Sequence, residues 1–267
     1  MKINLIVCAA TAIILTSLSA CGPSQTEQAA KKIKITEALL AKGDTINALL
    51  RLDSIPKLYP EAVSEINKAI QISNGIYSAQ LSKQRELLTG ANKVISSLLN
   101  EFKPEKGEFD RYTNYIPNRQ VFDKSWSRSF IQVTLNEKGD LTLASNYFGE
   151  SWLDHTSFRL VTGRLEVKTD SVPLDNINNH HSDFIPSKWE KVTYRGPKAD
   201  EVIVAIALNW DKKLKVVFTG KGKSTYIMWL EDYDKNAIKS AYELSKAFKI
   251  KSEAEKLIPV LEKKIKS

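Results

Sequence analysis

Three histidines carry the side chains best suited to chemistry in this 267-residue chain. The run His180-His181-Ser182-Asp183 combines residue types that bind metal ions. Adjacent histidines in an extended segment point to opposite sides of the backbone, however, and no further group of ligands accompanies them in the sequence. His155 stands beside Asp154 and has the chemistry of a general base, but the spacing places no nucleophile with it. We therefore expect no metal, no cofactor and no catalytic residue.

The tryptophans are a second group of candidate binding residues, because each ring can bury a large aromatic surface. All five fall in the middle of the chain, at Trp126, Trp152, Trp189, Trp210 and Trp229. Aromatic rings in such a region form either the core or an exposed binding platform, and the sequence leaves both open. Residues 171–187 read as an exposed loop too long to be a simple connector. We predict that any ligand contacts Trp152, His155, His180 and His181.

Two short motifs resemble parts of catalytic sites but are incomplete. Gly149-Glu150-Ser151-Trp152-Leu153 lacks the second glycine of a nucleophile elbow and lies in a β-rich context. Gly220-Lys221-Gly222-Lys223-Ser224 ends like a phosphate-binding loop, yet Val217 stands where the first glycine belongs, and no helix follows. We interpret them as a structural loop and a hairpin turn, and we expect a protein that is not an enzyme.

Composition and charge exclude several classes of function. Apolar residues make up 42% of the chain and charged residues 26%, which is typical of a globular protein outside the membrane. The net charge of +8 is not concentrated on the middle of the chain, because residues 105–232 hold 18 Lys/Arg against 18 Asp/Glu. A nucleic-acid-binding domain would gather basic residues around its reading surface. We therefore expect no nucleic-acid partner.

The first half of the chain has the periodicity of helices. A helix is expected at about 27–42, a second after Asp44 and closed by Pro56 and Pro60, and then one long helix at about 61–102. The long helix carries a heptad-like seam of apolar residues, so it needs a partner. That partner is either the preceding segment, folded back as an antiparallel hairpin, or another chain.

After Pro104 the pattern changes to short alternating segments. Strands are expected at 130–135, 141–144, 157–161, 164–169, 189–194, 214–219 and 224–230. Residues 200–208 suit either a strand or a short helix, and we favour the helix. A helix from Asp232 or Asp234 to Phe248 follows, and Ser252 and Glu255 begin a short terminal one. The fold class is α+β, with a helical hairpin, then an antiparallel, sandwich-like β-rich domain closed by a C-terminal helix.

The N-terminal segment indicates where the protein is found. Lys2 precedes an apolar run from Leu5 to Leu18, and Leu18-Ser19-Ala20-Cys21 follows. This tetrapeptide resembles the lipobox of bacterial lipoproteins, in which the peptide is cut before the cysteine and the thiol and new amine are acylated. The resemblance implies a lipid attached at Cys21. Because Gly22, not aspartate, comes next, it also implies sorting to the outer membrane.

A second resemblance concerns the middle of the chain. Residues 147–153, Ile203 to Ala207, Lys213 to Gly220 and Trp229-Leu230 make it similar to a domain of uncharacterised bacterial exported proteins, which implies a fold but no site residues. The expected domains are a signal peptide (1–20), a tether (21–26), the helical hairpin (27–104) and the β-rich domain (105–267).

These features predict a lipid-anchored envelope protein that binds another envelope protein or a glycan. Two alternatives remain open. One is a structural spacer that self-associates through the helical hairpin, and the other is a hydrolase of envelope polymers, for which the sequence shows no catalytic group.

Overall fold

The computed structural model describes residues 23–266, so the lipobox and Cys21 lie outside the described residues. The expected α+β class is confirmed, with helices first, then two antiparallel sheets and a C-terminal helix. The chain divides into two compact units, Met1–Ala79 and Gln80–Ser267. This division falls inside the long helix α3 (Val63–Leu98) and not at the expected boundary between residues 104 and 105.

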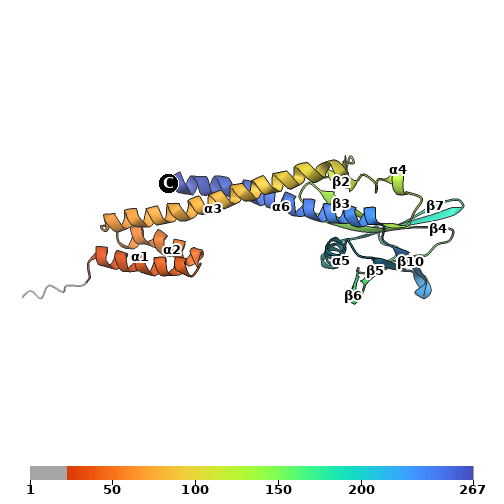
Figure 1. Cartoon of the computed structure of the whole chain (residues 1–267), viewed down its shortest axis with the longest axis horizontal. Helices are drawn as coiled ribbons and strands as arrows, with labels where there is room; N and C mark the ends of the chain where they lie inside the picture. Colours follow the sequence, from red (N-terminus) through yellow and green to blue (C-terminus); the bar gives the residue numbers. More distant parts are fainter. Residues whose placement is uncertain (1–22, 267) are drawn as a thin grey trace, which may run out of the picture. The chain divides into compact units, whose positions relative to one another are not determined.

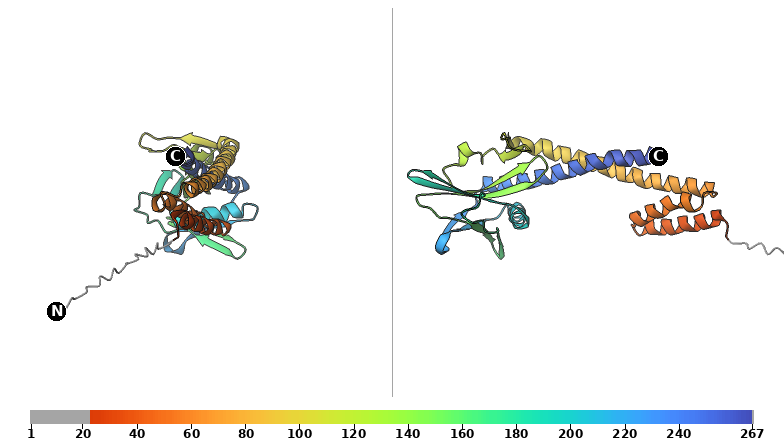
Figure 2. Two further views of the ribbon diagram at one scale, coloured as in Figure 1. Left: turned by 90° about the vertical axis from the view of Figure 1, so that its left-hand side faces the viewer. Right: turned by 180° about the vertical axis from the view of Figure 1, so that it is seen from behind.

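The first unit is a helical hairpin with a short apolar core. Helices α1 (Gln25–Ala41) and α2 (Thr45–Leu58) lie side by side, as the different views in Figures 1 and 2 show. Ser24 and Glu27 form a capping box at the start of α1, and the Asp44 side chain accepts the Asn47 N–H at the start of α2, as expected for that aspartate. The first part of α3 completes the core, whose buried apolar residues are Ala29, Ile33, Leu52, Ile55, Ala62 and Ala69.

Two details of the helical region differ from expectation. Pro56 lies inside α2, close to its C-terminal end, where it removes one late backbone hydrogen bond without stopping the helix. The long helix ends at Leu98, a 3-10 turn follows, and Pro104 lies in strand β1 (Phe102–Glu105). Because β1 is at the edge of its sheet, the missing N–H of proline is tolerated there.

The expected seam of α3 is only partly buried. Ser73, Tyr77 and Ala91 are buried, but Leu87 is 39% exposed, and Val63 and Ile70 are exposed as well. The expectation that this apolar seam, which includes Leu87, is covered by a partner therefore holds only in part. The helix runs unbroken through Gly75 and Gly90. Because several residues of the seam are exposed, heptad spacing alone did not determine which face of the helix is covered.

The second unit contains two antiparallel sheets. The larger has the order β1-β2-β3-β4-β8-β7, and the smaller has the order β10-β9-β5-β6. Besides β1, the larger sheet comprises β2 (Asn114–Pro117), β3 (Phe130–Asn136), β4 (Leu141–Gly149), β7 (Asn179–Phe184) and β8 (Ser187–Tyr194). The smaller comprises β5 (Ser157–Thr162), β6 (Leu165–Lys168), β9 (Lys215–Thr219) and β10 (Thr225–Trp229). A short helix, α4 (Phe122–Ser125), precedes β3.

Strand β7 corrects the expected loop at 171–187. His180 and His181 lie in this strand and pair with Lys191 and Glu190 of β8. The sequence signal is weak because β7 is an edge strand made mostly of polar residues, without the apolar alternation of a half-buried strand.

Two helices close the core between the sheets. α5 (Pro197–Leu208) confirms the helix favoured for residues 200–208. α6 (Asp232–Lys266) is one helix and not the expected two, and it continues through Pro259. The core joins the inner faces of both sheets to α5 and α6, with Ile131, Val133, Leu143, Phe158, Leu160, Val192, Ile203, Phe218, Ile238 and Leu244 all buried.

α6 also runs beside the second part of α3 (Figures 1 and 2), and Arg85 Nη2 lies 2.7 Å from Glu262 Oε1.

Within residues 23–266, no helix combines the length and apolar character needed to cross a membrane.

The core of the first unit can be tested with two isoleucines on α1. Ile33 is 1% exposed and Ile35 is 47% exposed. Ile33→Ala should lower the free energy of unfolding by about 2–5 kcal/mol, because it leaves a cavity in a small core. Ile35→Ala should change it by less than about 0.5 kcal/mol. Urea unfolding followed by circular dichroism measures both, and equal losses would contradict the assigned face.

Candidate functional site

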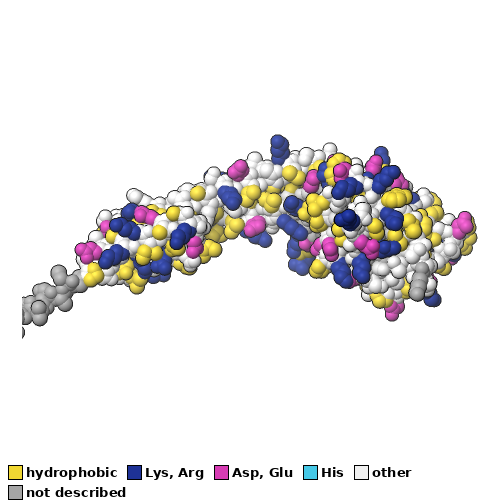
Figure 3. All heavy atoms as spheres, turned by 60° about the horizontal axis from the view of Figure 1, so that its bottom comes forward, with side chains coloured by type: hydrophobic (Ala, Val, Ile, Leu, Met, Phe, Trp, Pro, Cys, Tyr) yellow, Lys and Arg dark blue, Asp and Glu magenta, His cyan; other side chains and the backbone are white. Residues whose placement is uncertain are grey.

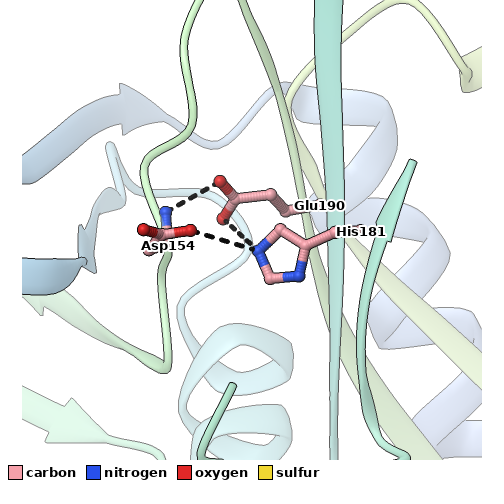
Figure 4. Close-up of side chains that lie close together, drawn as sticks. All are labelled: Asp154, His181 and Glu190. Atoms are coloured by element: carbon pink, nitrogen blue, oxygen red, sulfur yellow. Dashed lines mark hydrogen bonds and ion pairs between the residues drawn. The ribbon is translucent and has the colours of Figure 1, made fainter. Parts of the chain in front are cut away.

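The candidate site is formed where one loop meets two strands of the larger sheet. The segment between β4 and β5 carries Trp152, Asp154 and His155, and the paired strands β7 and β8 contribute His181 and Glu190. Figure 4 shows Asp154 and His181 turned toward Glu190. Residues far apart in the sequence therefore converge on one carboxylate.

Glu190 is fully buried, and its carboxylate holds the loop in place. Oε1 accepts the backbone N–H groups of Leu153 (2.7 Å) and Asp154 (2.8 Å). Oε2 accepts the backbone N–H of His155 (2.9 Å) and its Nδ1–H (2.5 Å). Burial by itself raises the pKa of Glu190, but the hydrogen bonds from His155 and the backbone outweigh it and lower the pKa below 4.5. The group is therefore an ionised carboxylate at neutral pH.

A chain of hydrogen bonds continues from His155 into the interior. His155 Nε2 lies 2.8 Å from Ser145 Oγ, which lies 2.9 Å from the Tyr194 hydroxyl. With a neutral His155 imidazole, Nδ1–H donates to Glu190, Ser145 donates to Nε2, and Tyr194 donates to Ser145. Burial raises the pKa of Tyr194 far above its ordinary value, so its hydroxyl keeps the proton that it donates.

The order Ser145–His155–Glu190 is that of a serine, histidine and acid triad, but no substrate can reach it. All three side chains are fully buried. The Tyr194 hydroxyl also occupies a hydrogen-bonding position of Ser145 Oγ. A catalytic serine must present its oxygen to a substrate. This arrangement instead fixes the orientation of His155 and, through it, of Glu190.

His181 completes the surface of the site. Its Nε2 lies 3.6 Å from Asp154 Oδ1 and 3.8 Å from Glu190 Oε2, and this buried atom has no hydrogen-bond partner. The Trp152 ring meets the imidazole edge-on, with the ring centroids 5.0 Å apart. Asp154 has φ 54°, the only positive φ of a non-glycine residue in the described part of the chain. Asp154, His181 and Glu190 together offer three donor atoms within 4.8 Å of one another.

His180 points to the other side of the sheet, as expected for adjacent residues of a strand. Its Nε2 lies 2.9 Å from Ser182 Oγ, and its ring centroid lies 6.0 Å from that of Trp189. On that side the aromatic rings of Phe122, Trp126, Phe148, Phe184 and Trp189 contact one another in pairs. Of the predicted ligand-binding residues, the structure thus brings together Trp152, His155 and His181 and separates His180 from them. His155 is fully buried, however, so the prediction that a ligand contacts it is wrong.

The tryptophans form no part of the buried core. Trp126, Trp152, Trp210 and Trp229 are exposed, and Trp189 is half-buried. The incomplete motifs behave as interpreted, because residues 150–156 form a loop and residues 221–223 a 3-10 turn between β9 and β10.

Glu190, Ser145 and Tyr194 were missed in the sequence. Glu190 did carry a signal, because it shares the inward face of β8 with Val192 and Tyr194. A charged residue on the apolar face of a strand must find partners when it is buried.

Comparison of the chain with protein-family models, with curated proteins and with solved structures finds no match. Its function is therefore argued from the geometry of the site.

A second surface feature lies within the same unit. A groove between the second part of α3 and α6 is lined by apolar residues that include Leu87, Ala91, Val94 and Ile250. Charges of both signs, Lys83, Glu86, Glu243 and Lys246, line it as well. This groove is the surface that a self-associating spacer would use.

Replacing Glu190 tests its role in holding the loop. In Glu190→Gln an amide N–H₂ replaces one acceptor and faces backbone N–H donors, so stability should fall by about 2–4 kcal/mol at about pH 7. Glu166→Gln is the matched control, because its ion pair with Arg159 is largely exposed.

The lowered pKa of Glu190 also predicts how the stability loss in Glu190→Gln depends on pH. A carboxyl whose pKa is lowered by folding contributes stability above its unfolded pKa and loses it as pH falls through the folded value. The difference between wild type and Glu190→Gln should therefore shrink below pH 4.5, the ordinary value for glutamate. Urea unfolding at several pH values measures this, and a difference that does not depend on pH would contradict an ionised Glu190.

Proposed function

We propose that this protein is a lipid-anchored component of a bacterial envelope and that its β-rich unit binds a ligand without catalysing a reaction. The binding surface consists of Trp152, Asp154 and His181. The observation that carries the proposal is the placement of Trp152, a 39% exposed ring held against His181, which lies beside the buried Glu190.

A rigid exposed aromatic residue is a favourable binding element. Trp152 buries a large area on contact, and its position between His181 and Lys188, whose Nζ lies 5.3 Å from the ring centroid, restricts its rotamers before binding. Lys188 is itself paired with Asp183 (2.5 Å). The surface therefore offers one aromatic face next to the Lys188–Asp183 ion pair and to the carboxylate of Asp154.

Charge distribution supports a ligand recognised at short range. Figure 3 shows basic and acidic side chains interspersed over the visible face of the β-rich unit. With 18 charges of each sign in residues 105–232, long-range attraction of a strongly charged partner is weak. An envelope glycan or an uncharged protein segment fits this surface better than nucleic acid.

We propose that the unit does not catalyse a reaction because the residues that resemble a catalytic triad are buried. The hydrogen-bonded Ser145–His155–Glu190 chain has no exposed atom through which a substrate could react. Its role in this proposal is to position the residues of the surface.

Binding can be tested with two exposed tryptophans. The full chain in detergent would be titrated against immobilised envelope glycans and, separately, against outer-membrane protein extracts. Trp152→Ala should weaken binding about 10-fold or more, because central aromatic residues dominate binding energy. Trp229→Ala, which removes a 59% exposed ring on β10, should leave it unchanged. Equal affinities of the two variants would place the site elsewhere.

Membrane attachment has its own test. Cys21→Ser should move the protein from the membrane fraction to the soluble fraction, because it removes the acceptor of the lipid, and two or more acyl chains anchor a protein almost permanently. Cys8→Ser, which lies within the expected signal peptide, should leave fractionation unchanged. A Cys21→Ser protein that still sediments with membranes in high salt would rule out the lipid anchor.

A further inference from the structure

The unpartnered Nε2 atom of His181 is the starting point for a second inference. This nitrogen is buried and accepts or donates no hydrogen bond in the structure, although two carboxylate oxygens lie near it. A buried polar atom without a partner costs about 1–3 kcal/mol, so its position calls for a physical cause.

The two distances indicate what belongs between these atoms. At 3.6 Å and 3.8 Å, the nitrogen is too far from Asp154 Oδ1 and Glu190 Oε2 for a direct hydrogen bond. Two bonds of about 2.1 Å to one metal ion at a tetrahedral angle place their donor atoms about 3.4 Å apart, close to the separations seen here. All three donor atoms lie within 4.8 Å of one another, so a small inward shift of their side chains brings them to the spacing of ligands around a single ion.

We propose that Asp154, His181 and Glu190 form a binding site for one Zn²⁺ ion. The donor set is one imidazole nitrogen and two carboxylate oxygens, which zinc binds readily and which Mg²⁺ and Ca²⁺, with their preference for oxygen alone, do not match. The inference goes beyond the proposed function and does not depend on the identity of the ligand.

The surroundings of the three residues match those of a metal site. Glu190 is oriented by His155 and by three backbone N–H groups, as outer partners orient metal ligands in proteins. Its Oε2 already accepts two of these N–H groups, so an ion bound to that oxygen takes the place of one of them. The Trp152 ring against His181 limits the rotation of the imidazole.

The site is also accessible and not already neutralised. The side chains of His181 and Asp154 are 25% and 32% exposed, so the site lies next to solvent. The cation nearest to Trp152 in the described contacts, Lys188, is paired with Asp183 and not with Asp154 or Glu190. Three protein ligands leave a fourth position for water or for a group of a bound partner.

Adjacent histidines supply a matched pair of variants for the test. The full chain in detergent, first freed of metal with a chelator, would be titrated with ZnCl₂ alone and followed by calorimetry and by thermal unfolding. We expect one Zn²⁺ per chain and a rise in the melting temperature. His181→Ala should weaken binding at least about 100-fold, since it removes a ligand, and His180→Ala should leave it unchanged.

A second variant guards against misfolding. Asp154→Asn keeps the size of the side chain and tolerates φ 54°, because asparagine adopts the left-handed region more readily than most residues. It should also weaken Zn²⁺ binding while its melting temperature without metal stays near that of the wild type. Absorption of the Co²⁺-loaded protein in the visible range provides a spectroscopic readout of tetrahedral coordination.

The proposal is overturned if the wild-type chain shows no saturable Zn²⁺ binding, or if it prefers Mg²⁺ or Ca²⁺. It is also overturned if His180→Ala reduces the affinity as much as His181→Ala. None of these measurements involves an envelope ligand, so their failure is distinct from failure of Trp152-dependent binding.

Discussion

The carboxylate of Glu190 is the interaction on which the β-rich unit depends. An ionised group taken out of water is costly unless hydrogen bonds replace its hydration. Four N–H donors do so here, and three of them come from consecutive backbone positions, Leu153 to His155. The loop must therefore take one conformation for the sheet to bury Glu190. The order of the loop and the burial of the charge are two aspects of the same constraint.

This constraint determines what the surface presents. The backbone of Asp154 is held with a positive φ, and its side chain lies next to His181, which also makes a T-shaped contact with the Trp152 ring. A loop held by main-chain hydrogen bonds can keep an aromatic residue exposed without collapse onto the core. The proposed binding surface and the proposed metal site therefore both include residues of this anchored segment.

The sequence predicted the fold class and most elements, because apolar alternation and helical periodicity are local signals. It failed where a local signal was weak or was outweighed by tertiary contacts. Strand β7 has mostly polar residues because only one of its side chains is buried, and Pro56 and Pro259 lie within helices. At the site, the opposite orientation of His180 and His181 followed from strand geometry. Glu190 and Ser145, however, reach the site through the pairing of β4 with β8, which spacing does not reveal.

The hydrogen bonds of the interior network all run in one direction, from Tyr194 to Glu190. With a neutral His155, Tyr194 donates to Ser145, Ser145 to His155 and His155 to Glu190, so every donor along this chain points toward the carboxylate. Successive hydrogen bonds of this kind strengthen one another and stabilise negative charge at their end. In a protease the same order of residues directs reactivity outward to a serine. Here the serine lies at one end of the buried chain, and the buried acid lies at the other end beside His181, which favours holding a cation or a positively polarised group over attacking a substrate.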